Sequence, residues 1–232
     1  MISFVVPAYN EEKYLGPTLE AIHAAAREAG EPYEIVVADD ASTDATAGIA
    51  RAHGARVVGV SHRQIAATRN AGARAATGDR LIFVDADTRV NGPVVAQALA
   101  ALAGGAVGGG APVEIDRAPR WAVLFMKAFV PLYFRLARWA AGCFVFCTRA
   151  AFEAAGGFDE RYYASEEIHF SRALKRQGRF VIVERFVTTS PRKLEGRSAL
   201  AMLWLMARTL AAGPAALRRR GEHTAFWYPD RR

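Results

Sequence analysis

Residues 80 to 87, Arg80-Leu81-Ile82-Phe83-Val84-Asp85-Ala86-Asp87, combine a short apolar run with two carboxylates. Such a run predicts a strand of a parallel sheet that is covered on both faces. On an extended backbone, Asp85 and Asp87 would point the same way, about 6–7 Å apart. Two carboxylates at that spacing can share a hard divalent cation, and the alternative is a solvated acidic turn. The position directly after a buried strand favours the metal site.

The chain before this stretch alternates between strand-like and helix-like segments. Three further apolar runs predict strands at Ile2–Val6, Glu34–Ala38 and Arg56–Val60. Helical segments are expected between them, at Leu15–Ala26, 45–53 and 64–76. Repeated alternation with short connections predicts an α/β fold with a mostly parallel, doubly wound sheet and helices on both faces. In such sheets, ligands bind at the carboxyl ends of the strands.

Polar side chains follow the predicted strands at this edge. Asn10-Glu11-Glu12 follows the first strand and Asp39-Asp40 follows the second. The carboxylates of Asp39 and Asp40 suit the N–H of a uracil ring or the hydroxyls of a ribose. Capping of the next helix is the alternative role, which Ser42, Thr43 or Asp44 could serve. We therefore expect these strand ends and Asp85-Ala86-Asp87 to converge on one site.

Three basic or acidic groups elsewhere have both structural and functional interpretations. Arg69 lies in a predicted helix as a site residue or a surface charge, and Gly72 beside it indicates close approach to a neighbouring backbone. Glu166 and Glu167 open a helix after Ser165, where a cap and the helix dipole favour acids, but either carboxylate could deprotonate an acceptor hydroxyl. Arg192 and Lys193 could close over a diphosphate or form a solvated basic loop.

The second half of the chain is less regular. A glycine-rich segment spans residues 104–110, and strands are expected at 111–115, 144–146 and 180–183. Helices are expected at 121–141, 149–155, 166–177 and 198–212. Because no long linker separates these parts, we expect one domain over residues 1–232. Residues 1–112 and residues 113–232 would form its two halves.

Composition sets the class of protein and its surroundings. With 52% hydrophobic and 23% charged residues, the chain has the profile of a globular protein rather than a disordered one. A net charge of +7 suits an anionic substrate, and equally a membrane surface. No signal peptide is evident at residues 1–7, and Cys143 and Cys147 are expected as buried thiols on the same side of one strand. A cytoplasmic protein is therefore expected.

Two apolar segments bear on membrane association. Residues 121–146 are interrupted by Lys127, Arg135 and Arg138, and residues 200–217 by Arg208. Neither is a span of about 20 uncharged residues. Core helices, or amphipathic helices lying on the inner face of a membrane, both fit this pattern.

Six motifs together resemble the family 2 glycosyltransferases, which have the GT-A fold. They are Val5-Val6-Pro7-Ala8-Tyr9-Asn10-Glu11-Glu12, Asp39-Asp40-Ala41-Ser42-Thr43-Asp44, Arg69-Asn70-Ala71-Gly72, Phe83-Val84-Asp85-Ala86-Asp87, Gly156-Gly157-Phe158-Asp159-Glu160 and Ser165-Glu166-Glu167. Their order covers most of the chain up to about residue 180, and it is similar to that of short stand-alone bacterial members.

The resemblance implies an inverting transfer from a nucleoside diphosphate sugar, with UDP favoured and with Mg²⁺ or Mn²⁺, to a sugar, lipid-linked or other hydroxyl acceptor. It places Pro7, Tyr9, Glu11, Asp39 and Asp40 around the nucleoside and Asp85 beside the ribose and phosphates. Asp87 becomes the most direct metal ligand, and Gly157, Phe158 and Asp159 border the acceptor. Glu167 matches the family's base better than Glu166 does. The resemblance also makes residues 1–112 the nucleotide-sugar-binding half of the domain and residues 113–232 the acceptor-binding half. The late histidine ligand of many GT-A enzymes is missing from the segment 188–193.

Two other functions compete with this interpretation. A sugar-phosphate nucleotidyltransferase would carry a glycine-rich, arginine-containing loop after the first strand, where this chain has Pro7-Ala8-Tyr9-Asn10. A non-catalytic nucleotide-sugar-binding protein would need neither Glu166 nor Glu167. No nucleic-acid partner is expected.

Overall fold

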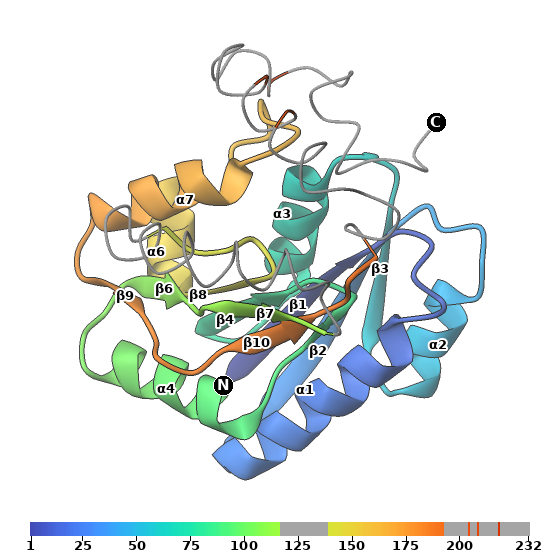
Figure 1. The fold of residues 1–232 in the computed structure, drawn as a ribbon, viewed down its shortest axis with the longest axis horizontal. Coiled ribbons are helices and arrows are strands. Elements are labelled where there is room, and N and C mark those ends of the chain that lie inside the picture. Colours follow the sequence, from blue (N-terminus) through green and yellow to red (C-terminus); the bar gives the residue numbers. More distant parts are fainter. Residues whose placement is uncertain (117–138, 193–203, 205–207, 209–217, 219–232) are drawn as a thin grey trace.

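A seven-stranded sheet forms the centre of the molecule (Figure 1). In this computed structural model, residues 1–116, 139–192, 204, 208 and 218 are described. The strands are β1 (Ile2–Ala8), β2 (Tyr33–Asp40), β3 (Arg56–Val60), β4 (Arg80–Val84), β6 (Gly108–Gly110), β8 (Phe144–Thr148) and β9 (Phe180–Ile182). They lie in the order β3-β2-β1-β4-β8-β6-β9.

The apolar runs of the sequence form the parallel part of this sheet. β1 is buried along its whole length, as expected for a strand covered on both faces. It pairs in parallel with β2 and β4, so that Val5 lies opposite Val36 on one side and Phe83 on the other. β8 runs antiparallel to β4 and to β6. The predicted mostly parallel α/β sheet is confirmed, with one antiparallel strand inserted.

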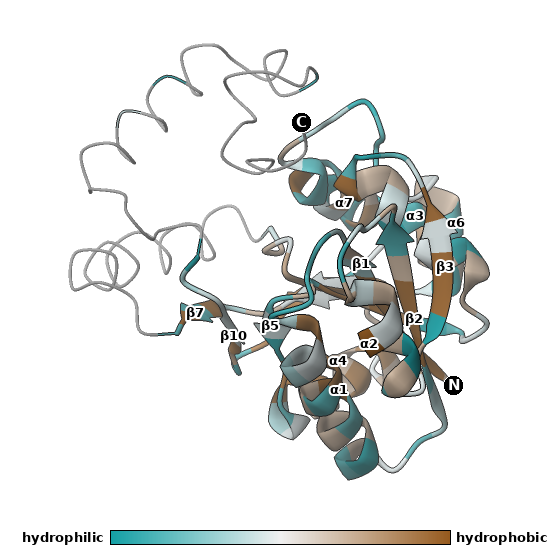
Figure 2. Cartoon of the chain, turned by 90° about the vertical axis from the view of Figure 1, so that its right-hand side faces the viewer, coloured by the Kyte–Doolittle hydropathy of each residue, from teal (hydrophilic) through white to brown (hydrophobic). Residues whose placement is uncertain are grey.

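Helices cover both faces of the sheet, as the alternating pattern predicts. They are α1 (Leu15–Ala29), α2 (Thr46–Ala52), α3 (Ile65–Ala75), α4 (Gly92–Ala103), α6 (Arg149–Ala155) and α7 (Glu166–Lys175). Figure 1 shows α1, α2 and α4 on one face of the sheet and α3, α6 and α7 on the other. Side chains of the first three helices share one apolar core, and those of the other three share the second. The strands are coloured as largely hydrophobic in Figure 2, whereas polar residues face outward on the helices.

A second, three-stranded sheet has the order β5-β10-β7. Its strands are β5 (Thr88–Arg89), β10 (Val187–Thr189) and β7 (Val113–Ile115). The backbone N–H of Ser190 donates to the carbonyl of Asp87 at 3.1 Å just beyond β10. This small sheet therefore carries residues 190–192 to the turn that follows β4.

Some sequence expectations differ from the fold. The glycine-rich segment contains β6. A Cβ on Gly109 would lie 1.9 Å from the carbonyl oxygen of Val181, so only glycine permits the pairing of β6 with β9. Cys143 precedes β8 and packs against one core, whereas Cys147 packs in the other. The expectation that both thiols face the same side is wrong, because the backbone turns before Phe144; neither cysteine forms a disulfide.

The two apolar segments considered for a membrane are largely outside the described residues. Trp139, Ala140 and Ala141, at the end of the helix expected over 121–141, are not helical. The helix expected over 198–212 lies outside the described residues except for 204 and 208. Within the described part of the chain, no helix is long and apolar enough to cross a membrane.

Candidate active site

Asp85 and Asp87 lie in a turn at the carboxyl end of β4. The N–H of Thr88 donates to the carbonyl of Asp85 at 3.0 Å, which closes the turn directly after Val84. The extended backbone expected from the sequence is therefore wrong. The turn aims the two carboxylates at different arginines, Asp85 at Arg69 and Asp87 at Arg192.

Arg192 joins Glu11 to Asp87. Its two terminal nitrogens donate to the two carboxylate oxygens of Glu11, both at 2.7 Å. Its Nε lies 2.7 Å from Oδ2 of Asp87, which also accepts from the hydroxyl of Ser190 at 3.0 Å. The guanidinium lies over the ring of Tyr14. Arg192 is thus paired with two carboxylates rather than a solvated loop charge; Lys193 lies outside the described residues.

Three carboxylates, Glu11, Asp85 and Asp87, gather at this edge. Burial raises the pKa of Glu11 against the opposing hydrogen bonds and charge of Arg192, and the charges of Asp87 and Asp85 add to the rise. The three carboxylates are therefore close enough to repel one another. In the described part of the chain, no three His, Cys, Asp or Glu side chains form a complete metal site. The donor set of Asp85 and Asp87 fits a hard cation that takes its other ligands from phosphate and water.

The loops after β1 and β2 interlock beside this cluster. Asn10 accepts from the N–H of Thr43 at 2.8 Å, and its own N–H donates to the hydroxyl of Ser42 at 2.9 Å. The N–H of Glu11 donates to the hydroxyl of Thr46 at 2.7 Å. Asn10 adopts a left-handed backbone with φ 53°, which asparagine tolerates better than most residues. These contacts fix the position from which Glu11 reaches Arg192.

The two acids at the end of β2 have different surroundings. Asp39 accepts from the N–H of Ser42 at 3.3 Å and borders the interlocked loops. Asp40 is fully buried and accepts from the N–H groups of His62 and Arg63 at 2.7 and 2.8 Å. Asp40 therefore fixes the loop between β3 and α3. The capping role proposed for this segment belongs to Asp44, which accepts from the N–H of Thr46 at 2.9 Å.

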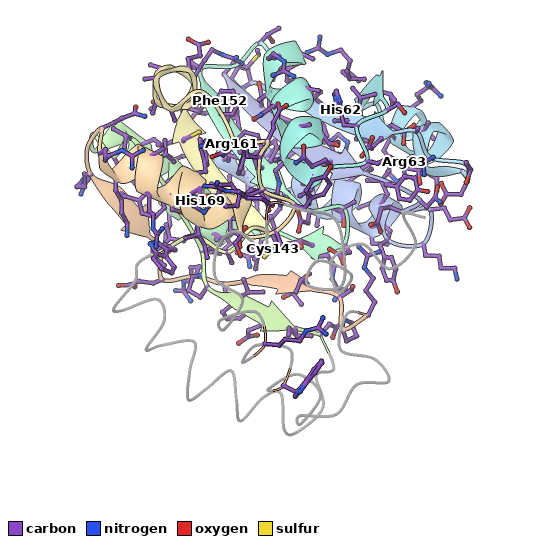
Figure 3. All side chains as sticks on the ribbon, turned by 90° about the horizontal axis from the view of Figure 1, so that it is seen from above. His62, Arg63, Cys143, Phe152, Arg161 and His169 are labelled. Atoms are coloured by element: carbon purple, nitrogen blue, oxygen red, sulfur yellow. The ribbon has the colours of Figure 1, made fainter. Side chains whose placement is uncertain are left out.

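The remaining residues expected around the nucleoside also lie at this edge. Pro7 is buried in β1 opposite Ala38 of β2, and Tyr9 follows the strand and is half-buried. The guanidinium of Arg63 lies over the ring of Tyr9. Figure 3 labels His62 and Arg63 on the loop that leads into α3. An aromatic ring next to a cation offers a surface for a nucleoside.

Arg69 connects the turn after β4 to the start of α7. It is 1% exposed, so the surface-charge alternative is excluded. Its Nη2 donates to Asp85 Oδ1 and to the carbonyl of Gly142, both at 2.7 Å, and its Nη1 lies 2.5 Å from Glu166 Oε1. The charges of Asp85 and Glu166 raise the pKa of Arg69 despite burial. The buried guanidinium of Arg69 therefore links Asp85, after β4, to Glu166, at the start of α7.

Glu166 and Glu167 differ in their partners although they are adjacent. Glu166 is buried against Arg69, and burial raises its pKa against the opposing charge of that arginine. Glu167 is half-buried and lies next to Gly142. Burial raises the pKa of Glu167 to about 8, and the charge of Glu166 adds to the rise. A side-chain cap from Ser165 was expected but is not formed, because Ser165 has a left-handed backbone with φ 64°.

The residues expected at the acceptor are held by Asn70. Its amide accepts from the N–H of Phe158 at 2.8 Å and donates to the carbonyl of Phe158 at 2.9 Å. Gly157 has φ 75° and packs on Asn70, so a side chain there would be strained. The carboxylate of Asp159 forms an ion pair with Arg161 at 2.7 Å. These residues line a groove between α3 and α7, on the other side of the Phe158 ring from Arg69.

Several residues of the site carry no sequence signal that the chain alone reveals. Gly142 brings its carbonyl to Arg69, and Ser190 brings its hydroxyl to Asp87. Both depend on pairings between distant segments. The acid motifs themselves were identifiable because each follows a predicted strand or opens a predicted helix.

Comparison with known proteins agrees with this geometry. The family model described as Glycosyl transferase family 2 matches residues 3–155, about two thirds of the chain. The chain therefore belongs to glycosyl transferase family 2. Its fold is GT-A, as the solved structures it resembles indicate.

Among similar proteins, the chain is 35% identical over 111 residues to validoxylamine A glucosyltransferase of Streptomyces hygroscopicus subsp. limoneus, covering 45% of this chain and 24% of the relative. It is 36% identical over 95 residues to undecaprenyl-phosphate 4-deoxy-4-formamido-L-arabinose transferase of Aeromonas hydrophila, covering 38% and 29%. The chain thus matches about a quarter of the length of these curated relatives.

Similar solved structures include the mannosyltransferase PcManGT of Pyrobaculum calidifontis, in complex with GDP-Man and Mn²⁺, with a TM-score of 0.69 and 21% identity over 99% of this chain and 67% of that one. Another is S. aureus TarS in complex with UDP-GlcNAc, with a TM-score of 0.66 and 19% identity, covering 99% and 72%.

Proposed function

We propose that this chain is an inverting glycosyltransferase that moves a sugar from a nucleoside diphosphate sugar, a UDP-sugar in the first instance, to a hydroxyl acceptor. The observation that carries the proposal is the position of Arg69 between Asp85 and Glu166. The proposed donor edge, with Asp85, lies on one side of the buried guanidinium of Arg69. The carboxylate pair of Glu166 and Glu167 lies on the other side. Family membership supports sugar transfer, and the complexes of PcManGT and TarS motivate a nucleotide-sugar donor.

The donor is proposed to occupy the edge formed by β1, β2 and β4. Pro7, Tyr9, Glu11 and Asp39 line the nucleoside side, and Asp40 fixes the neighbouring loop. Asp85 lies at the ribose and phosphate side, Arg192 and Lys193 are assigned to the diphosphate, and Arg69 holds Asp85 in place. Asp87, with Asp85, would hold Mg²⁺ or Mn²⁺. Such a cation offsets the charge that builds on the leaving diphosphate.

Glu167 is the proposed base. As the acceptor oxygen forms its bond to the anomeric carbon, the bond from that carbon to the diphosphate oxygen breaks, and Glu167 takes the proton of the acceptor hydroxyl. A pKa of about 8 makes this carboxylate a stronger base than an ordinary glutamate. Attack from the side opposite the diphosphate inverts the anomeric centre. Glu166 stays paired with Arg69 and positions the start of α7.

The acceptor is proposed to approach Glu167 along the segment Gly157-Phe158-Asp159. It is a sugar, a lipid-linked compound or another hydroxyl compound. The lipid-linked alternative is motivated by the relative named undecaprenyl-phosphate 4-deoxy-4-formamido-L-arabinose transferase. A lipid-linked acceptor would place the enzyme at the cytoplasmic side of a membrane.

A donor screen tests the proposal. Thermal unfolding of the full chain is measured with UDP-, GDP- and dTDP-sugars, each with and without Mn²⁺, and donor hydrolysis is measured for the best ligand. We expect the largest metal-dependent shift with a UDP-sugar, because stabilisation follows affinity. Glu167→Gln should retain the shift and lose hydrolysis, whereas Glu153→Gln, an exposed change on α6, should retain both. Equal hydrolysis by Glu167→Gln would overturn the base assignment, and binding without any turnover would favour a non-catalytic protein.

A further inference from the structure

A polar groove of about 800 Å³ lies between α3 and α7. Its floor is the segment from Ala155 to Arg161 that follows α6. Figure 3 shows Arg161 and His169 close together in this region, between the two helices. The groove is open to solvent, and its charged lining comes from three separate segments of the chain: Arg74 of α3, Asp159, Glu160 and Arg161 of the loop, and His169, Arg172 and Arg176 of α7 and its C-terminal cap.

Positive charge exceeds negative charge in this lining. The four arginines face two carboxylates, and both carboxylates already have partners. Asp159 pairs with Arg161 at 2.7 Å, and Glu160 accepts from the amide of Asn70 at 2.9 Å. Within the described part of the chain, Arg74 and Arg176 have no acidic partner. Two exposed guanidinium groups therefore face the groove with their charge uncompensated.

The charged groups around His169 are also mainly positive. Its ring stacks on Tyr162 with centroids 3.8 Å apart, and Arg218 donates to the hydroxyl of Tyr162 at 2.9 Å. Burial lowers the pKa of His169, and the charges of Arg172, Arg218 and Arg161 lower it further, while Asp159 acts in the opposite direction. A cluster of like charges in a concave surface concentrates counter-ions.

The groove shares Gly157, Phe158 and Asp159 with the proposed acceptor path, but it lies on the opposite side of α7 from Glu167. At 100° per residue, His169 and Arg176 lie about 160–180° around α7 from Glu167. The rings of Phe158 and Phe170 pack between the two sides, with centroids 4.2 Å apart. A ligand in the groove would therefore leave Glu167 and the donor edge accessible.

We propose that this groove is a second ligand site, and that it binds a phosphate group through Arg74 and Arg176. Guanidinium groups present paired N–H donors that match phosphate oxygens, and Arg74 of α3 and Arg176 at the C-terminal cap of α7 line the same groove. The phosphate belongs either to a soluble phosphate compound or to an anionic lipid headgroup. The site does not depend on the donor edge, so it can be tested whether or not the proposed transfer reaction is found.

The test compares two double variants of equal charge. Arg74→Gln/Arg176→Gln removes the groove cations, and Arg27→Gln/Arg51→Gln removes two exposed arginines from α1 and α2. Pyrophosphate binding is measured by calorimetry at low salt, and co-sedimentation is measured with vesicles of phosphatidylglycerol and phosphatidylcholine and with phosphatidylcholine alone. Circular dichroism verifies that each variant is folded, as expected for exposed positions.

We expect the groove variant to bind pyrophosphate or anionic vesicles at least about tenfold more weakly than wild type, while the control variant keeps wild-type affinity. Loss with pyrophosphate identifies a soluble phosphate ligand, and loss confined to anionic vesicles identifies a lipid headgroup. Arg192→Gln serves as the donor-edge control. Loss of binding in Arg192→Gln alone, equal loss in both double variants, or no binding by wild type would overturn the proposal.

Discussion

The Nε atom of Arg192 lies 2.7 Å from Oδ2 of Asp87, while the two terminal nitrogens of the same guanidinium bind Glu11. The guanidinium of Arg192 thus pairs with the carboxylate of Asp87, which is proposed to hold a metal ion. A metal that binds Asp87 must compete with this arginine or move it. Donor and metal binding are therefore expected to be coupled to movement of the Arg192 side chain.

Replacing Arg192 should raise the affinity for Mn²⁺ in the absence of donor. Arg192→Gln removes the competing charge and leaves Asp87 and Glu11 as uncompensated acids, so we expect several-fold tighter Mn²⁺ binding. Free Mn²⁺ can be followed by electron paramagnetic resonance. Arg185→Gln, at an exposed position just before β10, is the matched control and should leave the affinity unchanged. Weaker Mn²⁺ binding in Arg192→Gln would show that Arg192 does not compete.

Arg69 should be a major determinant of stability. Arg69→Met leaves the buried carboxylates of Asp85 and Glu166 without their shared cation, and we expect a loss of about 3–5 kcal/mol in the free energy of unfolding. Urea unfolding of the purified chain measures this loss. Arg74→Met, at an exposed position on the same helix, should change the stability by less than about 0.5 kcal/mol. Similar stabilities for the two variants would contradict the role assigned to Arg69.

Gly72 should resist substitution for a reason that lies in the packing of α3 on the sheet. A Cβ there would lie 2.5 Å from Cγ1 of Val5 and 3.3 Å from the Cβ of Ala38. Gly72→Ala is therefore expected to destabilise the protein by about 1–3 kcal/mol. Gly48→Ala in α2 meets no atom within 4 Å and should be neutral or stabilising by up to about 1 kcal/mol. Thermal unfolding distinguishes the two, and a neutral Gly72→Ala would refute the close contact.

The pH dependence of transfer should report Glu167. Because its pKa is raised to about 8, the carboxylate is mostly protonated at neutral pH and becomes available as a base as the pH rises through 8. With donor and metal kept saturating at every pH, kcat/KM for the acceptor should increase about tenfold per pH unit below the pKa and level off above it. Glu167→Gln should lose at least about a hundredfold in rate above pH 8, and its rate should not rise with pH as that of the wild type does. A rate that is flat from pH 6 to 9 would contradict this assignment.

The parallel core and most of the site motifs could be predicted from sequence, because they depend on local patterns. The apolar runs of β1, β2 and β4 are continuous, and each is followed by a polar strand end. Gly72 was also identified in this way, from the cost of a glycine inside a helix. These features need only the identity of neighbouring residues.

The parts that could not be predicted depend on contacts between distant segments. The carboxylates of Asp85 and Asp87 diverge because the chain turns directly after Val84, and a strand pattern does not mark that turn. Gly109 lies in a strand because it pairs with Phe146 and Val181, which are distant in sequence, and Val181 approaches too closely for any side chain at position 109. Arg192 reaches Glu11 across 181 positions of sequence, through the pairing of β10 with β5 and β7.

Donor turnover by Asp87→Asn tests the central claim most directly. Release of UDP from a UDP-sugar is measured with and without Mn²⁺ for wild type, Asp87→Asn and the exposed control Asp79→Asn. We expect metal-dependent release by wild type and by Asp79→Asn, and at least about a hundredfold less by Asp87→Asn. Metal-independent release, or equal release by Asp87→Asn and wild type, would contradict a metal-assisted transfer at the end of β4.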